Sequence, residues 1–326
     1  MVTKWRTEFI CESCGRLTKA PIGTQRLARK MCQECFGKGQ DKRPRELNEL
    51  TGAEWAKASK SVESYPDNRS EKQRLHGACF PKSLALHQIS IFTKKGELVL
   101  DPFVGVGTTL DAAYQLGRRG IGIELNDEFA NIAQKDLIAS GCTSEQVRLI
   151  IDDARNMELY VAPYSVDFIL TSPPYSNLLK NISGSFAYKW REHSNIDPVS
   201  NPRPYSSKGE DLSNMNYGNY LSCIKEVFVS SYCVLRDNSY AVWVVKDFRN
   251  LKEGVVYVNL HGDIIECAES AGFILWDIRI YDQTRFRPLV CLGYPSRNFY
   301  LNIGHSYLLT FKKGERTNGT QNSKAT

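Results

Sequence analysis

ELVLDPFVGVGTT, residues 97–109, is a short apolar strand that runs directly into a glycine-rich turn. The residues that follow, to about 117, have the composition of a helix, and Gly117 ends it. Glycine lets the backbone approach a ligand closely, and the N–H groups at the start of a helix favour a carboxylate or a phosphate. The stretch therefore predicts a strand, a turn and a helix that bind a nucleotide-like ligand.

A second strand, GIGIE at residues 120–124, ends in an acid. Glu124 lies 19 positions after Gly105, about where a nucleotide-binding βαβ unit has its ribose-binding acid. A nicotinamide site would fit this spacing. However, Leu110 occupies the place of the third glycine of G-x-G-x-x-G, and the Asp-Pro-Phe lead-in is foreign to dehydrogenases.

The rest of the chain continues the alternation of strands and helices. We expect further strands at 147–151, 166–171, 239–246, 273–281 and 305–312, and helices at 127–140, 217–235 and 256–271. Such alternation predicts an α/β fold with a doubly wound, mostly parallel sheet and helices on both faces. Ligands of such sheets bind at the carboxyl ends of strands, which is where the motifs of this chain fall.

TSPPY, residues 171–175, follows the apolar run 166–170. Its two prolines donate no backbone N–H and leave their carbonyls free to accept hydrogen bonds. A serine hydroxyl precedes them and a tyrosine ring follows. This set suits a planar group that carries an exocyclic amine, and the alternative is a Pro-Pro turn capped by a packed tyrosine.

DPFVGVGTT, GIELN and TSPPY together resemble the motifs of the amino-methyltransferases that modify cytosine N4 or adenine N6 in DNA. The resemblance extends over roughly residues 75–313 and implies a Rossmann-like methyltransferase fold. HGACFP at 76–81 resembles the family's upstream Phe-Pro motif, IDDAR at 151–155 its acidic turn, and HSYLLTF at 305–311 its last strand. The cofactor motif precedes the catalytic motif, as in a minority of the family, and Val106 stands where smaller residues are commoner.

The resemblance implies S-adenosylmethionine as the cofactor. Asp101 would hold the methionine amino group, Glu124 the ribose hydroxyls and Asp153 the adenine amine. An ordinary helix cap is the alternative role for Asp153. The turn would pack closely on the cofactor, its threonines would reach the carboxylate, and the phenylalanines would lie beside the cofactor. The expected cofactor residues are Phe80, Asp101, Phe103, Gly105, Gly107, Thr108, Thr109, Glu124 and Asp153.

The resemblance places catalysis in the TSPPY motif. The target base must leave the duplex to reach the cofactor. Tyr175 would stack on it, and the Ser172 hydroxyl and the Pro173 carbonyl would accept hydrogen bonds from its amine. The expected catalytic residues are Ser172, Pro173, Pro174 and Tyr175. No histidine is required, so we expect packing or surface roles for His76, His87, His193, His261 and His305.

The target base is the open question at this stage. A serine at the head of the motif resembles the cytosine-N4 branch, whereas aspartate or asparagine is commoner with adenine. We therefore expect cytosine N4. The alternatives are adenine N6 of DNA, an RNA base, a small-molecule methyltransferase and a non-enzymatic zinc-ribbon protein that binds DNA.

Four of the ten cysteines form a metal-binding pattern. Cys11-x-x-Cys14 and Cys32-x-x-Cys35 are separated by 17 residues, the spacing of a four-thiolate zinc ribbon. Two knuckles of this kind surround one tetrahedral Zn²⁺. Coincidental pairing is the alternative, and the remaining cysteines are expected to be buried hydrophobic residues.

The positive charge of the chain and a long segment after the TSPPY motif suggest double-stranded DNA as the partner. The formal net charge is +6, and basic residues outnumber acidic ones in the ribbon segment. The expected phosphate contacts are Lys19, Arg26, Arg29, Lys30, Lys38, Lys42, Arg43 and Arg45. A segment of about 40 residues, 176–216, is too long for an ordinary connection and is rich in basic, amide and aromatic residues. We expect it to recognise the target together with 282–304; structural decoration is the alternative.

We divide the chain into a zinc ribbon at 1–45, a linker at 46–74, a methyltransferase domain at 75–313 and a disordered tail at 314–326. No apolar run reaches the length of a membrane span, and no secretory signal is recognisable at the start. We therefore expect a cytoplasmic protein, monomeric or homodimeric. We also expect it to act together with a cognate restriction endonuclease, and this expectation comes only from what is usual in the family that it resembles.

Overall fold

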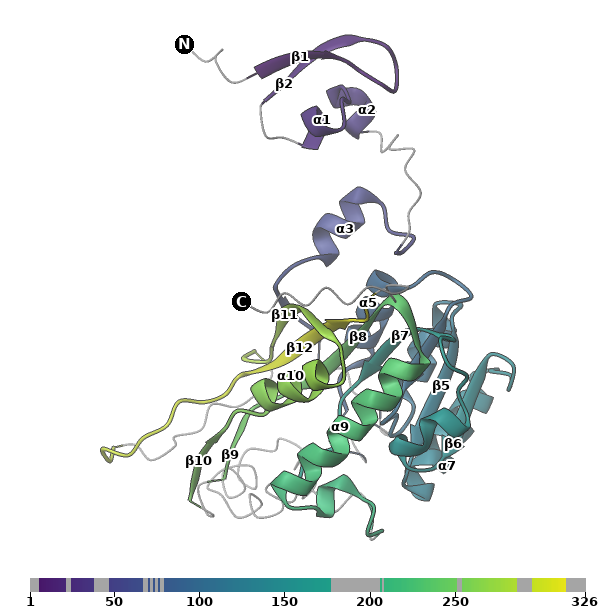
Figure 1. The fold of residues 1–326 in the computed structure, drawn as a ribbon, viewed down its shortest axis with the longest axis vertical. Coiled ribbons are helices and arrows are strands. Elements are labelled where there is room, and N and C mark those ends of the chain that lie inside the picture. The colour runs from purple at the N-terminus through teal and green to yellow at the C-terminus, as the bar shows by residue number, and fades with distance from the viewer. Residues whose placement is uncertain are drawn as a thin grey trace, which may run out of the picture. The chain divides into compact units, whose positions relative to one another are not determined.

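A computed structural model describes residues 6–21, 25–37, 47–66, 70, 73, 76, 79–176, 206, 208–250, 254–285 and 295–314. The chain forms two compact units, Met1–Ala58 and Ser59–Thr326 (Figure 1). The expected tail, from residue 315 on, lies outside the described residues, as does most of the expected recognition insert.

The first unit is small and contains an antiparallel hairpin of β1 (Arg6–Ile10) and β2 (Leu17–Pro21). Three short helices follow: α1 (Gln25–Ala28), α2 (Gln33–Gly37) and α3 (Gly52–Ala58). The hairpin turns at Gly15, whose φ of +73° favours glycine. The buried cluster of this unit consists of Met31 and three of the four expected metal-binding cysteines.

The second unit is built on an eight-stranded sheet with the strand order β3-β11-β12-β8-β7-β4-β5-β6. Among its described strands, β12 alone runs antiparallel to both neighbours. The strands are β3 (Val62–Ser64), β4 (Leu98–Asp101), β5 (Arg119–Glu124), β6 (Val147–Ile151), β7 (Val166–Thr171), β8 (Leu235–Val245), β11 (Ile274–Asp282) and β12 (His305–Lys312). The doubly wound, mostly parallel α/β fold that we expected is confirmed.

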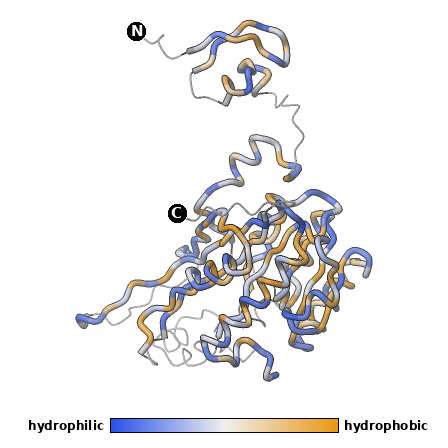
Figure 2. The backbone as a smooth tube through the Cα atoms, viewed as in Figure 1, coloured by the Kyte–Doolittle hydropathy of each residue, from blue (hydrophilic) through white to orange (hydrophobic). Residues whose placement is uncertain are grey.

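Helices cover both faces of this sheet, because alternate residues of each strand point to opposite sides. Val242 and Val244 of β8 join the cluster under α5 (Lys82–Phe92) and α6 (Thr108–Gln115). Ala241 and Trp243 join the larger cluster under α9 (Tyr217–Val234) and α10 (Leu260–Ser270). Figure 2 shows that hydrophobic residues are concentrated along the central strands.

Helix α7 (Asp127–Ala139) connects β5 to β6. Its start is encoded locally: the Asn126 side chain accepts hydrogen bonds from the N–H groups of Glu128 and Phe129. Asp127 and Glu128 then place negative charge in the first turn, which the helix dipole favours. This start fixes the position of Leu125 and Asn126 just beyond the end of β5.

Some elements differ from the expectation. Residues 255–258 form β10 (Val255–Val258), which pairs with β9 (Phe248–Asn250), so the helix expected at 256–271 begins only at Leu260. The segment 46–74, expected as a linker, contains α3 and also β3, the parallel edge strand of the large sheet. Among the helices in the described part of the chain, none has the length and apolar character needed to cross a bilayer.

The order of the strands sets the place of the ligand site. The chain proceeds from β4 outward to β5 and β6, and then returns to form β7 on the other side of β4. The carboxyl ends of β4 and β7 therefore flank a topological switch point, where open α/β sheets bind ligands. DPFVGVGTT begins at the first of these ends and TSPPY at the second.

Candidate active site

Asp101 is the buried centre of the switch point. Its carboxylate accepts hydrogen bonds from Thr109 Oγ1 at 2.5 Å, Thr171 Oγ1 at 2.6 Å and Phe103 N at 3.0 Å. Burial raises the pKa of Asp101 to about 6, although these hydrogen bonds lower it. Asp101 therefore connects the turn after β4 to the end of β7. Thr109, another expected cofactor residue, donates its hydroxyl hydrogen bond to Asp101 within the protein.

The turn after β4 needs its glycines. Gly105 and Gly107 have φ values of +54° and +85°. A Cβ at Gly105 would lie 2.9 Å from His76 Nε2, and one at Gly107 would lie 3.1 Å from Ala133 Cβ. Val106, the one departure from the family pattern, is fully buried between them. The turn is thus a tight cradle that a larger residue at either glycine would disturb.

Gln73 connects this turn to the Phe-Pro motif, and the sequence analysis did not identify it. Its side-chain amide donates to Thr108 Oγ1 at 3.0 Å and to the Phe80 carbonyl at 3.1 Å. The expected cofactor residue Thr108 therefore already has a partner within the protein. A buried glutamine beyond the motif carries no local sequence signal, so only the folded structure reveals it.

Glu124 ends β5 with both carboxylate oxygens held by backbone N–H groups. Gly105 N donates to Oε2 at 2.8 Å and Asn126 N donates to Oε1 at 2.9 Å. Burial raises the pKa of Glu124 to about 7, against the lowering effect of these two donors, and nearby Asp101 and Asp211 raise it further. A carboxylate fixed in this way is oriented to accept hydrogen bonds from hydroxyl groups of a ligand.

A cleft at the switch point brings the two motifs together, with about 680 Å³ of space free of protein atoms, including open solvent. Phe103, Glu124 and Asp153 line it, together with all four residues of the expected catalytic set, Ser172–Tyr175. The other expected cofactor residues do not line it: they are Phe80, Asp101, Gly105, Gly107, Thr108 and Thr109. Asp101 and Thr109 are instead buried behind its wall.

His76 also lines the cleft, although we expected a packing or surface role. Its ring lies 4.5 Å from that of Phe129, and burial lowers its pKa to about 4. The imidazole is therefore neutral at neutral pH. Its position at the head of HGACFP, the expected Phe-Pro motif, is the sequence signal that could have indicated this place.

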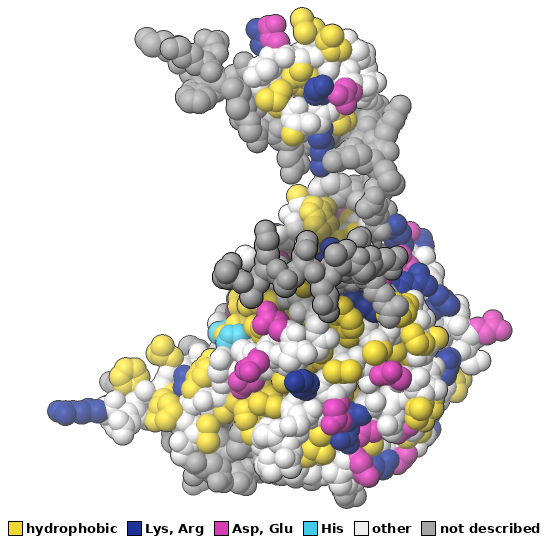
Figure 3. All heavy atoms as spheres, viewed as in Figure 1, with side chains coloured by type: hydrophobic (Ala, Val, Ile, Leu, Met, Phe, Trp, Pro, Cys, Tyr) yellow, Lys and Arg dark blue, Asp and Glu magenta, His cyan; other side chains and the backbone are white. Residues whose placement is uncertain are grey.

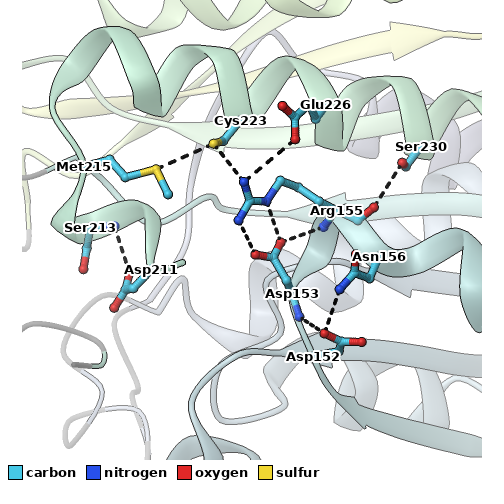
Figure 4. A network of polar contacts seen from close by, with 10 residues as sticks. All are labelled: Asp152, Asp153, Arg155, Asn156, Asp211, Ser213, Met215, Cys223, Glu226 and Ser230. Atoms are coloured by element: carbon cyan, nitrogen blue, oxygen red, sulfur yellow. Dashed lines mark hydrogen bonds and ion pairs between the residues drawn. The ribbon is translucent and has the colours of Figure 1, made fainter. Parts of the chain in front are cut away.

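Asp153 is both a helix cap and a cleft residue. It precedes the 3-10 helix η1 (Ala154–Leu159) and accepts from Arg155 N at 2.9 Å. Arg155 also grips the carboxylate with its side chain, through Nε at 3.0 Å and Nη2 at 2.6 Å. Figure 4 shows the guanidinium between Asp153 and two side chains of α9, Cys223 and Glu226. The capping role is confirmed, and the adenine-binding role stays a prediction.

The TSPPY motif contacts β8 and the short hairpin that follows it. The Ser172 hydroxyl donates to the Val244 carbonyl at 2.9 Å, so its oxygen lone pairs remain to accept. The half-buried Tyr175 ring meets Phe248 edge-on, with centroids 5.8 Å apart. The motif therefore presents an oriented acceptor and a supported aromatic ring to the cleft.

The four cysteines of the first unit lie together, with all Sγ atoms within 4.8 Å of one another. Cys14 and Cys32 Sγ are 3.8 Å apart, and Cys11 Sγ accepts from Cys32 N at 3.2 Å. Zinc–sulfur bonds of about 2.3 Å in a tetrahedron place sulfurs about 3.8 Å apart. The donor set and its spacing therefore fit a Zn²⁺ ion.

Comparison with known proteins agrees with this geometry. A family model described as DNA methylase matches residues 25–135. Type II methyltransferase M.BglI of Bacillus subtilis is 37% identical over 91 residues, which are 28% of this chain and 26% of that protein. Type II methyltransferase M2.DpnII of Streptococcus pneumoniae is 47% identical over 64 residues, 20% of this chain and 24% of that protein.

Over residues 25–135 the chain is therefore similar to the DNA methylase family, and shorter stretches of it are similar to Type II methyltransferases. The matched stretches span about a quarter of the length of these relatives. Among solved structures, the chain is similar to TrmN from Thermus thermophilus, with a TM-score of 0.42 and 16% identity, over 74% of this chain and 52% of that one.

The DNA methylase match covers one half of the site. It contains the glycine turn and Glu124 but ends before TSPPY. The assignment of the catalytic half therefore depends on its residues and its position in the cleft. Glu124 and the TSPPY residues line one cavity.

Proposed function

We propose that this protein is an S-adenosylmethionine-dependent DNA methyltransferase that modifies the exocyclic amine of a flipped base, cytosine N4 in the first instance. One observation carries the proposal: the acid that ends β5 and the TSPPY motif that follows β7 line the same cleft. A cofactor held by Glu124 and a base held by Ser172–Tyr175 would meet there.

The cofactor half of the cleft fits an adenosyl group with an amino-acid tail. Glu124 would accept from the ribose hydroxyls, and Asp153, clamped by Arg155, would accept from the adenine amine. The Gly105–Gly107 cradle lets the backbone approach the ligand closely. Asp101 and Thr109 would support the turn near the methionine end, because their side chains already bond each other. The bound cofactor supplies an electrophilic methyl group on a sulfonium.

The other half fits a planar base. Tyr175 offers a ring face for stacking and is kept in place by Phe248. Ser172 Oγ, whose proton is directed at the Val244 carbonyl, would accept from the amine, and so would the Pro173 carbonyl. Two acceptors in fixed positions orient the nitrogen lone pair and stabilise the positive charge that develops on nitrogen.

Cytosine N4 is proposed because a serine, and not an acid or amide, heads the motif. Adenine N6 is the second candidate, since its amine is similar and the same acceptors serve both. The relatives are named as Type II methyltransferases, which supports DNA as the substrate and a restriction endonuclease as a companion. The non-enzymatic alternative predicts lost site residues, whereas Glu124, Ser172 and Tyr175 all line the cleft.

The first unit is proposed to be a zinc ribbon that contributes to DNA binding. Cys11, Cys14, Cys32 and Cys35 would hold the ion. Two of the expected phosphate-binding residues, Lys19 and Lys30, form ion pairs with Glu8 and Glu12. These pairs are exposed, and exposed pairs are weak enough for phosphate to replace them.

The proposal is tested by mass analysis of nucleosides from the DNA of cells that express the chain. N4-methylcytosine is expected with the intact protein and should be lost with Ser172→Ala. Ser165→Ala is the matched control, because the Ser165 hydroxyl also donates to a backbone carbonyl but lies before β7 begins. Methylated base that persists in Ser172→Ala would contradict the assigned role of this serine.

A further inference from the structure

The cleft has a wall that the family motifs do not account for. Ser206, Glu210, Asp211 and Leu212 line it together with the motif residues. They lie far along the sequence from Glu124, in the last part of the expected recognition insert, 176–216. We call residues 206 and 208–214 the latch loop; it includes the 3-10 turn η4 (Leu212–Asn214).

The latch loop is held together by Asp211, which is almost fully buried. Asp211 Oδ2 accepts from Ser206 N at 2.6 Å and from Ser206 Oγ at 3.0 Å, and Oδ1 accepts from Ser213 N at 2.8 Å. The Asn214 amide donates to the carbonyls of Ser206 and Lys208. Figure 4 shows Asp211 and Ser213 on this turn. With these internal hydrogen bonds, the loop can act as one stiff piece.

Lys208 connects the latch loop to the turn that follows β5. Lys208 Nζ donates to the Leu125 carbonyl at 2.7 Å and lies 3.1 Å from Asp127 Oδ2. Leu125 directly follows Glu124 and lines the cleft. Lys208 also lines a neighbouring polar hollow, which shares Leu125, Asp153 and Glu210 with the cleft. The lysine therefore stands where the ribose and adenine end of the cleft opens to solvent.

We propose that Lys208 is a positioning residue that keeps the latch loop closed over bound cofactor, through its hydrogen bond to the Leu125 carbonyl. This inference rests on the proposed function, since it takes S-adenosylmethionine as the ligand. The ion pair with Asp127 is secondary, because Asp127 is 63% exposed and water screens it. Closure by Lys208 slows the escape of cofactor without contributing an atom to the reaction.

The test is calorimetric titration of the full chain with S-adenosylmethionine, together with stopped-flow dissociation. Lys208→Met should weaken binding about tenfold, as expected for a charged hydrogen bond that is partly exposed. The loss should come from faster dissociation, with the melting temperature of the ligand-free protein unchanged. Lys208→Arg should restore most of the affinity, and Asp127→Asn should change it little. Lys135→Met, on the exposed side of α7, is the matched control.

Each outcome is decisive. Equal affinity in Lys208→Met and in the intact chain would overturn the latch while leaving the proposed function in place. A lower melting temperature of ligand-free Lys208→Met, with unchanged dissociation, would make the lysine merely structural. If the intact chain bound no S-adenosylmethionine, the proposed function itself would be wrong.

Discussion

At the scale of single residues, the site depends on carboxylates that burial keeps from ionising easily. Glu124, with a pKa of about 7, is the clearest of them. Its two oxygens are held by backbone donors, so its position does not change with pH, but its charge does. A ligand hydroxyl that donates to Glu124 binds best to the ionised form.

Cofactor affinity should therefore increase with pH. The sign follows from linkage: the ligand favours the deprotonated form, so binding strengthens as pH rises through the pKa. We expect the dissociation constant to fall between about pH 6 and about pH 8 and the slope to flatten in Glu124→Gln. Calorimetry at a series of pH values measures this. A slope that is unchanged in the variant would assign the dependence to another group, such as Asp101.

Gly105 gives a residue-scale prediction about stability. Gly105→Ala combines an unfavourable φ with a Cβ placed 2.9 Å from His76 Nε2. Gly96→Ala has the same sign of φ but meets no atom within 4 Å, so it reports the backbone strain alone. We expect Gly96→Ala to cost about 1 kcal/mol and Gly105→Ala about 2 to 3 kcal/mol. Urea unfolding measures both, and equal costs would show that the contact with His76 is relieved.

At the scale of elements, continuous apolar runs could be predicted well and contacts between distant segments could not. The strands expected at 147–151, 166–171 and 305–312 match β6, β7 and β12, because each is an apolar run bounded by polar or turn residues. Residues 256–258 were expected as the start of a helix but belong to the strand β10 (Val255–Val258), because a short apolar run fits either period. Gln73 was not identified, and Lys208 was expected only as one of the basic residues of the insert, because folding alone brings each of them next to its partner. The contact of Arg155 with Cys223 likewise joins residues that are far apart in the sequence.

The hairpin of the first unit gives an element-scale prediction. Cys32→Ser removes one of four sulfurs that lie within 4.8 Å of one another. We expect the variant to release zinc, measured by a colorimetric chelator, and to lose more affinity for DNA than for S-adenosylmethionine. Cys142→Ser, in the second unit, is the control. Unchanged DNA affinity in a folded, zinc-free variant would make the ribbon structural only.

At the scale of the whole molecule, the chain combines a unit built on an eight-stranded sheet with a separate cysteine-rich unit. Their compositions alone indicated this division, and contacts within the described residues place the boundary after Ala58. On the face drawn in Figure 3, basic and acidic side chains are interspersed over the larger unit. On that face the described side chains form no broad positive track for the phosphates of DNA, and we expect DNA recognition to depend on specific segments. The insert expected at 176–216 is the main candidate and lies mostly outside the described residues.

The central claim is that the methyl group is delivered to an exocyclic amine, and one measurement tests it most directly. Purified protein is incubated with S-adenosylmethionine deuterated in its methyl group and with DNA from a methylation-free host, and the digested nucleosides are identified by mass. The account predicts N4-methylcytosine that carries the deuterated methyl. Labelled N6-methyladenine would contradict the chosen base. No labelled nucleoside, from protein that binds the cofactor, would contradict the DNA methyltransferase assignment.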